Sequence, residues 1–453
     1  MSRINSTPTR LDMQDWRYPS LNSAYLRQSN NQPDELSFYS VAGGPGGPLL
    51  DIHADVLTIR IRGSGFGDFD ANGVPHSGTV TGASLFSGTF EVFFSELNMP
   101  VPAFLAMMDS NDPARMRAGL TGGNDLIEGG AQSGAAAGDI LIGGAGDDTI
   151  YSFGGHDTLS GGPGDDLFRT QYDFFLSTEP PSAAVIEGGE GFDVLAYDKA
   201  AGAVTIDAGL GVAGGDTFTG IESLVGSPFG DSMAGGGAGD ILLGRNGDDT
   251  IDGRAGNDSI EGNVGNDLIF GGAGSNYLRG VEGDDSMVGG GDFDDMNGNT
   301  GADTLRGGEG FDWVVGGQGD DMLYGDVGGD VVYGNLGSDT CVGGDGVDWV
   351  RGGQANDSLD GGAGNDLLWG DRGDDTVTGG LGADTFHAFV GGGLDRITDF
   401  NAAQGDRLIL DFAPPYTLRQ EGADTVVDLG GVDRVVLVDV TLASLPAGWI
   451  AVG

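Results

Sequence analysis

The sequence has few cysteines, lysines and histidines, and it has no long apolar run. Its 453 residues include one Cys, four His and 20 Lys plus Arg against 69 Asp plus Glu, which gives a formal net charge of −49 at pH 7. A single cysteine cannot form a disulfide within the chain. Phosphate contacts need a basic patch and a membrane span needs about 18 apolar residues together, so we expect no nucleic-acid partner and no membrane span.

The motifs of several familiar enzyme classes are also missing. The four histidines (His53, His76, His156 and His387) form no H-E-x-x-H, and no G-x-S-x-G supplies a lipase nucleophile. Lys199, the only lysine, lies in no G-x-x-x-x-G-K-[ST], which excludes a P-loop. We therefore expect a protein that is not an enzyme.

Glycine is abundant, at 90 residues, and it recurs with aspartate in a nine-residue unit that occurs 18 times in succession. A well-formed unit, residues 361–369, reads Gly-Gly-Ala-Gly-Asn-Asp-Leu-Leu-Trp. The sixth position holds Asp231, Asp240, Asp249, Asp258, Asp267, Asn276, Asp285, Asp294, Asp303, Asp312, Asp321, Asp330, Asp339, Asp348, Asp357, Asp366, Asp375 and Asp384. The eighth position is always apolar, and there we expect Cys341 to be a small buried hydrophobe.

These residue types suit a hard cation. Glycines at positions one, two and four let a turn adopt positive φ and expose its carbonyls, and the aspartate adds an anionic oxygen. The last three residues make a strand too short to be stable alone, so its apolar side chain is buried only when units stack. Stacked carboxylates repel one another unless a cation lies between them, so folding should be coupled to cation binding.

In this pattern the chain resembles the RTX family of calcium-binding nonapeptide-repeat proteins. The resemblance implies an all-β fold, a right-handed parallel β-roll in which two units make one turn and Ca²⁺ ions lie between successive loops of one edge. Eighteen units would give about nine turns, a rod of roughly 40–45 Å at a strand spacing of about 4.8 Å. It also implies export through the type I secretion apparatus and folding outside the cell, where calcium is plentiful.

A turn of two units sorts the carboxylates into two rows, with Asp231 in one and Asp240 in the other. Asn276 belongs to the second row, and its neutral amide should coordinate a cation more weakly. One turn further along that row, Asp292 replaces the fourth-position glycine. We hypothesise that Asp292 supplies the missing negative charge; the alternative is a single degenerate site.

A shorter block of repeats over residues 119–169 precedes the main array of 231–386. Its candidate metal ligands are Asp139, Asp148, Asp157 and Asp166, nine residues apart. Residues 170–230 read as a non-repetitive spacer that elaborates the side of the roll, in which Asp193 briefly restores the pattern.

Residues 1–118 lack the nine-residue repeat. Alternating apolar residues predict strands over 56–62, 78–86 and 88–94, and helical spacing predicts one helix over 102–118. We expect a small β-rich module that caps the N-terminal end of the roll. Residues 68–73 match the first half of an EF-hand, but Thr79 stands where Glu is required, so a hairpin turn is the better interpretation. Asp51, His53 and Asp55 could ligate a metal, although a solvated strand face is more usual.

Residues 387–453 form the expected C-terminal cap. The segments 395–400 and 405–410 resemble those that close RTX rolls, and 425–428 with 434–438 predict a β-hairpin. We expect residues 442–453 to hold the type I secretion signal, the alternative being a plain cap.

Two classes of function remain open. The first is a calcium-binding extracellular protein of a surface layer, matrix or attachment structure, with cell-surface polysaccharide or further copies of itself as partners. The second is a secreted polysaccharide epimerase or hydrolase whose catalytic part is the N-terminal module and whose roll serves folding and secretion. The first is preferred because about 118 residues leave little room for a catalytic domain.

Overall fold

The computed structural model describes the strands 37–41, 49–53, 58–67, 77–87 and 90–100, and residues 123–128, 140–152, 156–170, 183–412 and 414–453. It divides into two compact units. Unit 1 comprises residues 1–201 and 211–223, and unit 2 comprises residues 202–210 and 224–453. The short strand β16 (Ser223–Val225) spans the boundary between them in the sequence.

Unit 1 begins with an antiparallel meander. Its strands are β1 (Ser37–Val41), β2 (Leu49–His53), β3 (Thr58–Gly67), β4 (Ser77–Ser87) and β5 (Phe90–Pro100), each paired with the next. The three strands expected here are therefore confirmed. The expected helix over 102–118 and the EF-hand-like segment 68–73 lie outside the described residues. Strand β5 also pairs antiparallel with β6 (Leu126–Glu128), which continues the meander into the next part of the unit.

From β6 onward, the strands of unit 1 form two parallel ladders. One contains β6, β8 (Thr149–Tyr151), β10 (Leu167–Arg169) and β12 (Val194–Ala196). The other contains β7 (Ile140–Ile142), β9 (Thr158–Pro163), β11 (Val185–Glu190) and β15 (Asp216–Thr219), with β14 (Val212–Ala213) antiparallel to β15. Residues 185–196 and 212–219 thus add strands to the same ladders although they lack the nine-residue spacing.

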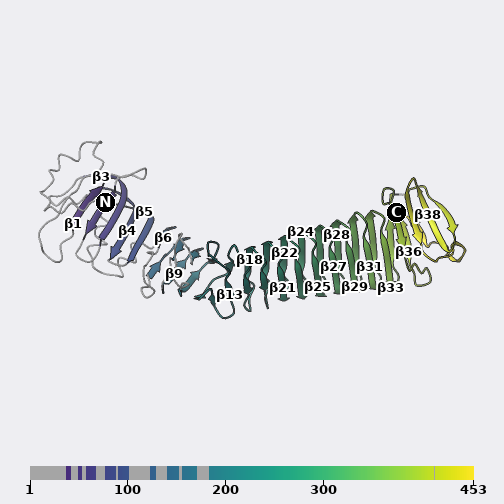
Figure 1. The fold of residues 1–453 in the computed structure, drawn as a ribbon, viewed down its shortest axis with the longest axis horizontal. Coiled ribbons are helices and arrows are strands. Elements are labelled where there is room, and N and C mark those ends of the chain that lie inside the picture. The colour runs from purple at the N-terminus through teal and green to yellow at the C-terminus, as the bar shows by residue number, and fades with distance from the viewer. Residues whose placement is uncertain are drawn as a thin grey trace. The chain divides into compact units, whose positions relative to one another are not determined.

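Unit 2 is built from two longer parallel ladders. Ladder A consists of β18 (Ile241–Asn246), β20 (Ser259–Val264), β22 (Tyr277–Glu282), β24 (Asp295–Thr300), β26 (Trp313–Gln318), β28 (Val331–Leu336), β30 (Trp349–Gln354), β32 (Leu367–Arg372), β34 (Thr385–Ala388) and β36 (Arg407–Leu410). Figure 1 shows the strands of unit 2 stacked in order from β18 to β36.

Ladder B runs through the alternate units of the sequence. It consists of β13 (Thr205–Asp207), β17 (Ser232–Ala234), β19 (Thr250–Asp252), β21 (Leu268–Ala273), β23 (Ser286–Gly291), β25 (Thr304–Gly310), β27 (Met322–Gly328), β29 (Thr340–Gly346), β31 (Ser358–Gly364), β33 (Thr376–Leu381) and β35 (Leu394–Ile397). Within the array each residue pairs with the one 18 positions later, as Leu305 does with Leu323. The predicted all-β parallel β-roll with two units per turn is confirmed.

The core of the roll in unit 2 is a column of eighth-position side chains. These residues are no more than 4 % exposed: Met233, Leu242, Ile251, Ile260, Ile269, Leu278, Met287, Met296, Leu305, Val314, Leu323, Val332, Cys341, Val350, Leu359, Leu368, Val377 and Phe386. Each strand therefore buries one apolar residue against its neighbours in the stack, at about 1.5–3 kcal/mol for a fully buried Leu, Ile or Val. Cys341 lies among them as expected, and burial raises the pKa of its thiol well above the ordinary value.

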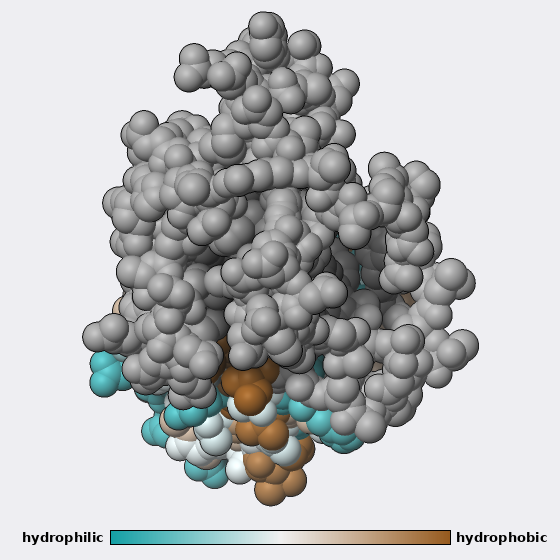
Figure 2. Space-filling model, turned by 90° about the vertical axis from the view of Figure 1, so that its left-hand side faces the viewer, coloured by the Kyte–Doolittle hydropathy of each residue, from teal (hydrophilic) through white to brown (hydrophobic). Residues whose placement is uncertain are grey.

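Apolar side chains also come to the surface of the strands. In the view of Figure 2 they form a narrow strip between hydrophilic residues. In unit 1, Ile140 and Val185 begin β7 and β11 and are 66 % and 55 % exposed. The outward slots of the strands are therefore not uniformly polar.

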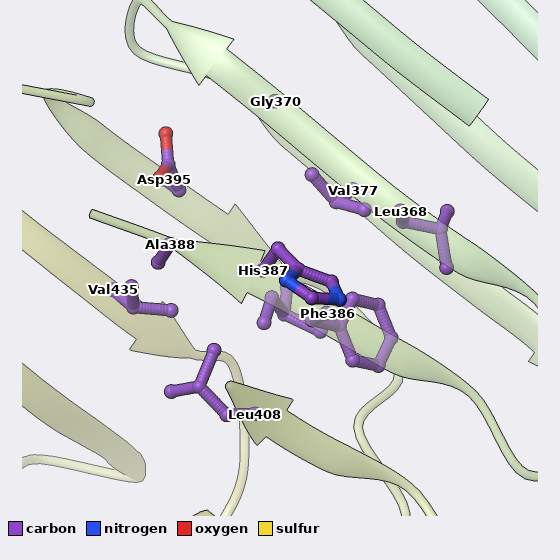
Figure 3. A pocket seen from close by; sticks show the side chains of 10 residues that line it. Leu368, Gly370, Val377, Phe386, His387, Ala388, Asp395, Leu408 and Val435 are labelled. Atoms are coloured by element: carbon purple, nitrogen blue, oxygen red, sulfur yellow. The ribbon is translucent and has the colours of Figure 1, made fainter. Parts of the chain in front are cut away.

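A small cap closes the C-terminal end of unit 2. The strands β37 (Thr417–Glu421), β38 (Asp424–Gly430) and β39 (Asp433–Leu437) are antiparallel, which confirms the predicted hairpin. Strand β39 pairs parallel with β35, and after a 3-10 helix (Leu442–Ser444) the strand β40 (Ile450–Val452) pairs parallel with β36. Leu368, Val377, Phe386, Leu408 and Val435 meet at this end of the core, where Figure 3 shows them with His387 and Asp395.

Candidate metal centre

The sixth-position aspartates form two rows along the roll, held by hydrogen bonds from one turn to the next. The Oδ1 atom of Asp303 accepts the backbone N–H of Asp285 at 2.8 Å, and Asp321 accepts from Asp303 at the same distance. The second row repeats this contact, as where Asp330 accepts from Asp312 at 2.8 Å. Each carboxylate is therefore fixed in orientation by the turn before it.

The other carboxylate oxygen has no hydrogen-bond partner. Among the described residues, the Oδ2 atom is buried and unpartnered in 18 aspartates: Asp148, Asp166, Asp193, Asp249, Asp258, Asp267, Asp285, Asp294, Asp303, Asp312, Asp321, Asp330, Asp339, Asp348, Asp357, Asp366, Asp375 and Asp384. A buried, unpaired carboxylate oxygen is costly unless a cation or a proton satisfies it.

The first glycine of each unit leaves the space in front of this oxygen open. A Cβ atom at Gly334 would lie 2.2 Å from Oδ2 of Asp339 and 2.6 Å from the carbonyl oxygen of Gly352, which belongs to the next turn. The backbone of Gly334 is not in the left-handed region, so the expectation that position one needs positive φ is wrong. Its glycine provides room, and an anionic oxygen and a carbonyl oxygen converge on that room, as a hard cation requires.

From the repeat of Asp249 onward, positions two and four do adopt left-handed backbone, except at Gly364. Gly317 and Gly319 have φ of 121° and 132°, and a Cβ at Gly319 would lie 1.8 Å from the carbonyl oxygen of Gly301. Asn299 and Asp326 take position two with φ of 73° in their own units. Position four is thus restricted by contact with the neighbouring turn as well as by φ.

Burial makes the ionised aspartates unstable in the absence of a cation. Burial raises the pKa of Asp303 to about 7, and the charges of Asp321 and Asp284 add to the effect, while the N–H of Asp285 opposes it. Burial likewise raises the pKa of Asp249 and Asp285 to about 7. A divalent cation beside Oδ2 would reverse this balance by favouring the ionised form.

Asp231 and Asp240 differ from the rest of the array because protein groups occupy their second oxygen. Oδ2 of Asp231 accepts the N–H of Ser227 at 2.6 Å, and Oδ2 of Asp240 accepts the N–H of Gly236 at the same distance. Neither Ser227 nor Gly236, both at position two, has left-handed backbone. These two predicted ligands are therefore less in need of a cation than those that follow.

Asn276 interacts directly with the next carboxylate of its row. Its Nδ2 donates to Oδ1 of Asp294 at 2.9 Å and to the carbonyl of Gly274 at 3.1 Å. Asp292 is exposed with φ of 64°, and its charge contributes to raising the pKa of Asp294 to about 7, mainly a result of burial. That Asp292 compensates for Asn276 stays a prediction, with its charge acting on Asp294.

Several acidic residues outside the counted repeats continue the rows. In unit 1 Asp193 accepts the N–H of Asp166, and Glu222 accepts that of Asp193. In unit 2 Asp395 accepts from Asp375, and Asp406 accepts from Asp384. The available signal was an acidic residue two places before a buried apolar one: Asp193 with Leu195, Glu222 with Leu224, Asp395 with Ile397, Asp406 with Leu408.

The remaining candidates are Asp51, His53, Asp55, Asp139 and Asp157. Asp55 and Asp139 lie outside the described residues, as do the side chains of Asp51 and His53. Asp157 has an Oδ2 that accepts a hydrogen bond from the hydroxyl of Ser152. Within the described ranges, no three His, Cys, Asp or Glu side chains gather as a metal site. A cation in the rows would therefore take one or two carboxylate oxygens and complete its shell with backbone carbonyls.

This architecture defines a class: a parallel β-roll with rows of buried carboxylates at its loops. The model of the RTX calcium-binding nonapeptide repeat, in four-copy windows, matches residues 133–168, 225–260, 234–269, 261–296, 297–332, 315–350 and 351–386. These residues belong to the RTX calcium-binding repeat family, and the residues described above fit calcium.

Two solved structures show weak likeness. The extracellular lipase LipA from Serratia marcescens is 11% identical, over 95% of this chain and 84% of that chain, with a TM-score of 0.23. A Ca²⁺-dependent, β-helical antifreeze protein from an Antarctic bacterium is 20% identical, over 63% and 73%, with a TM-score of 0.17. Such scores indicate neither a shared fold nor a function. No curated protein sequence matches the chain. In the part of the chain that the structure describes, no helix is long and apolar enough to cross a membrane.

Proposed function

We propose that this chain is a calcium-dependent extracellular structural or adhesive protein, of a surface layer, a matrix or an attachment structure, that folds when it binds Ca²⁺ after export. The observation that carries the proposal is the unpartnered Oδ2 atom repeated from Asp249 to Asp384. A globular core would satisfy or remove these oxygens. Here they recur with the repeat, beside a carbonyl of the next turn, so each turn contributes to a cation-dependent edge.

The same carboxylates separate an exportable state from a folded one. Without calcium, ionised aspartates oppose stacking and the chain stays extended; with calcium, the loops close and the column of apolar residues is buried. The C-terminal segment 442–453 pairs with β36 through β40 in the folded state. We propose that the type I apparatus reads this segment before the cap folds.

Circular dichroism of the full chain at pH 7 tests the proposal. We expect a disordered spectrum in chelator and a β spectrum in millimolar calcium, with magnesium at equal concentration far less effective because it prefers a smaller octahedral shell that keeps its waters. Elemental analysis of the folded chain should find several calcium ions per molecule. A β spectrum that persists unchanged in chelator would contradict the proposal.

A further inference from the structure

The outer face of ladder A carries aromatic residues that the core does not use. Trp313 and Trp349 begin β26 and β30 at the seventh position of their units, and their side chains are 48 % and 55 % exposed. The seventh position on the nearby strands of ladder B holds Thr304, Met322, Thr340 and Ser358. The repeat itself therefore does not require an indole in this slot.

A second column of side chains lies beside the first, at the ninth position. Tyr333, Arg351, Trp369 and His387 occupy four successive strands, β28 to β34. The guanidinium of Arg351 lies 5.2 Å from the ring centre of Tyr333 and 6.0 Å from that of Trp369, and Trp369 stacks on His387 at 4.2 Å. These contacts fix the rings in place.

The two columns meet and form one surface, which we call the aromatic platform: Trp313, Tyr333, Trp349, Arg351 and Trp369. The rings of Trp349 and Trp369 are 6.5 Å apart, which joins the columns at β30 and β32. Trp313 and Trp349 stand two strands apart, about 10 Å at a spacing of about 4.8 Å per strand. Two linked sugar rings of an extended chain have a similar length.

We propose that the aromatic platform binds a neutral, extended β-linked polysaccharide. The C–H faces of sugar rings pack against exposed indoles, and sugar hydroxyls need fixed polar groups beside them. Arg351 and Asp371 supply these, since Arg351 donates to the Asp371 carboxylate at 2.9 and 3.0 Å and lies between the rings of Tyr333 and Trp369. A broad, ordered aromatic surface of this kind is typical of a recognition site.

Charge selects among the possible occupants. The chain carries a formal charge of −49 before calcium binds, and each Ca²⁺ lowers the negative charge by two, so the chain stays acidic until about 25 ions are bound. An acidic polysaccharide or a second copy of the chain is therefore repelled. Arg351 is already paired with Asp371 and offers little to an anion. A neutral glycan is not repelled by this charge. The inference rests on the proposed function, because the platform exists only when the strands of the roll are stacked.

Binding of the full chain to insoluble cellulose and chitin in millimolar calcium tests the proposal, with soluble carboxymethylcellulose as the acidic comparison. We expect retention by a neutral glycan and none by carboxymethylcellulose. The variant Trp313→Ala/Trp349→Ala should bind about tenfold or more weakly, as expected for central aromatic contacts. The variant Trp313→Tyr/Trp349→Tyr, which keeps a ring in each slot, should retain most of the affinity.

The matched control is Phe270→Ala/Met322→Ala, which removes two exposed apolar residues from ladder B and should bind as the parent does. Circular dichroism in calcium is recorded for every variant. A folded parent that binds neither glycan would overturn the platform and leave the proposed function standing, whereas a parent that does not fold with calcium would overturn the proposed function itself. An equal loss of glycan binding in the control variant would also overturn the proposal. So would a parent dimer that the Trp variants abolish, because a second copy of the chain would then occupy the platform.

Discussion

Two neighbouring stretches of unit 2 differ in what contacts the second carboxylate oxygen of their repeat aspartates. From Asp249 to Asp384, the second oxygen of each repeat aspartate is buried without a partner. In the two repeats before them, backbone N–H groups of Ser227 and Gly236 satisfy that oxygen in Asp231 and Asp240. The difference follows the backbone at position two, which is left-handed in the array, as at Arg245, and not in the earlier pair.

This contrast shows what the left-handed residue does. Where position two has positive φ, its N–H does not reach the carboxylate, and a cation is needed. Where position two does not have positive φ, its backbone N–H donates to the carboxylate, and the loop needs no cation. Calcium dependence is therefore set by loop conformation as well as by the presence of aspartate, and the comparison can be tested by changing either one.

The largest expected effect is that of pH in the absence of calcium. Burial raises the pKa of Asp249, Asp285 and Asp303 to about 7, against about 3.8 in the unfolded chain. The folded state then holds protons that the unfolded state has lost, so the metal-free roll is most stable below pH 4 and loses stability as pH rises to 7. Circular dichroism in chelator should show more β structure at pH 5 than at pH 7. The reverse order would refute this account of the carboxylates.

Next in size is the replacement of a fourth-position glycine. Gly319→Ala puts a Cβ 1.8 Å from the carbonyl of Gly301 on a residue with φ of 132°, and strain plus overlap should cost about 3–5 kcal/mol. Gly237, at the third position of a repeat in the earlier pair, has open space around its Cβ position. The fourth position of those two repeats holds Phe229 and Ala238. Gly237→Ala should change stability by less than about 1 kcal/mol. Thermal unfolding in saturating calcium compares the two, and equal losses would count against the close contact between turns.

A smaller effect is expected from neutralising one carboxylate in each stretch. Asp303→Asn keeps the acceptor for Asp285 but removes the unpartnered anionic oxygen, so it should lower the number of bound calcium ions and cost about 2 kcal/mol in calcium. Asp231→Asn lies in the same row and should leave the number of ions unchanged, although its amide then faces the N–H of Ser227. Counting the calcium ions bound by each variant tests this prediction. A loss of ions in both variants would show that Asp231 binds calcium as Asp303 does.

The smallest effect concerns Asn276. Asn276→Asp removes the hydrogen bond to Asp294 and adds a like charge beside it, which should destabilise the roll by about 1 kcal/mol at limiting calcium. At saturating calcium the added carboxylate should recover this loss. Asn246→Asp adds the same charge at an exposed position and serves as the control. A calcium titration monitored by tryptophan fluorescence gives both values, and identical curves for the two variants would argue against a role for position 276.

Much of the fold could be predicted from the sequence because every repeat makes the same contacts with the repeat 18 residues later. The apolar slot at Leu305 or Cys341 and the aspartate two places earlier fix the strand, its inward side and the register of 18 residues. The rows of carboxylates follow directly, since each turn repeats the previous one. The cap could be predicted because segments 395–400 and 405–410 resemble those that close RTX rolls and because 425–428 and 434–438 have the pattern of a hairpin.

Other features depend on conformation that residue type does not reveal. Gly236 and Gly317 are the same residue at the same position, yet only Gly317 is left-handed. The sequence therefore could not separate Asp240 from the aspartates of the array. Asp193 stood out in the sequence as restoring the pattern, whereas Glu222 did not. Insertions obscured the place of both in the rows, which continue at 27 and 29 residues in place of 18. The role of the first glycine was misjudged because its constraint is a contact with the next turn.

The most direct test of the central claim is to locate calcium in a crystal of the full chain by anomalous X-ray scattering. We expect anomalous peaks beside Oδ2 of the array aspartates, such as Asp303 and Asp339, each close to a carbonyl of the following turn. We expect none at Asp231 and Asp240, where the N–H groups of Ser227 and Gly236 take that place. Peaks at Asp231 and Asp240 equal to those of the array, or an array without peaks, would contradict it.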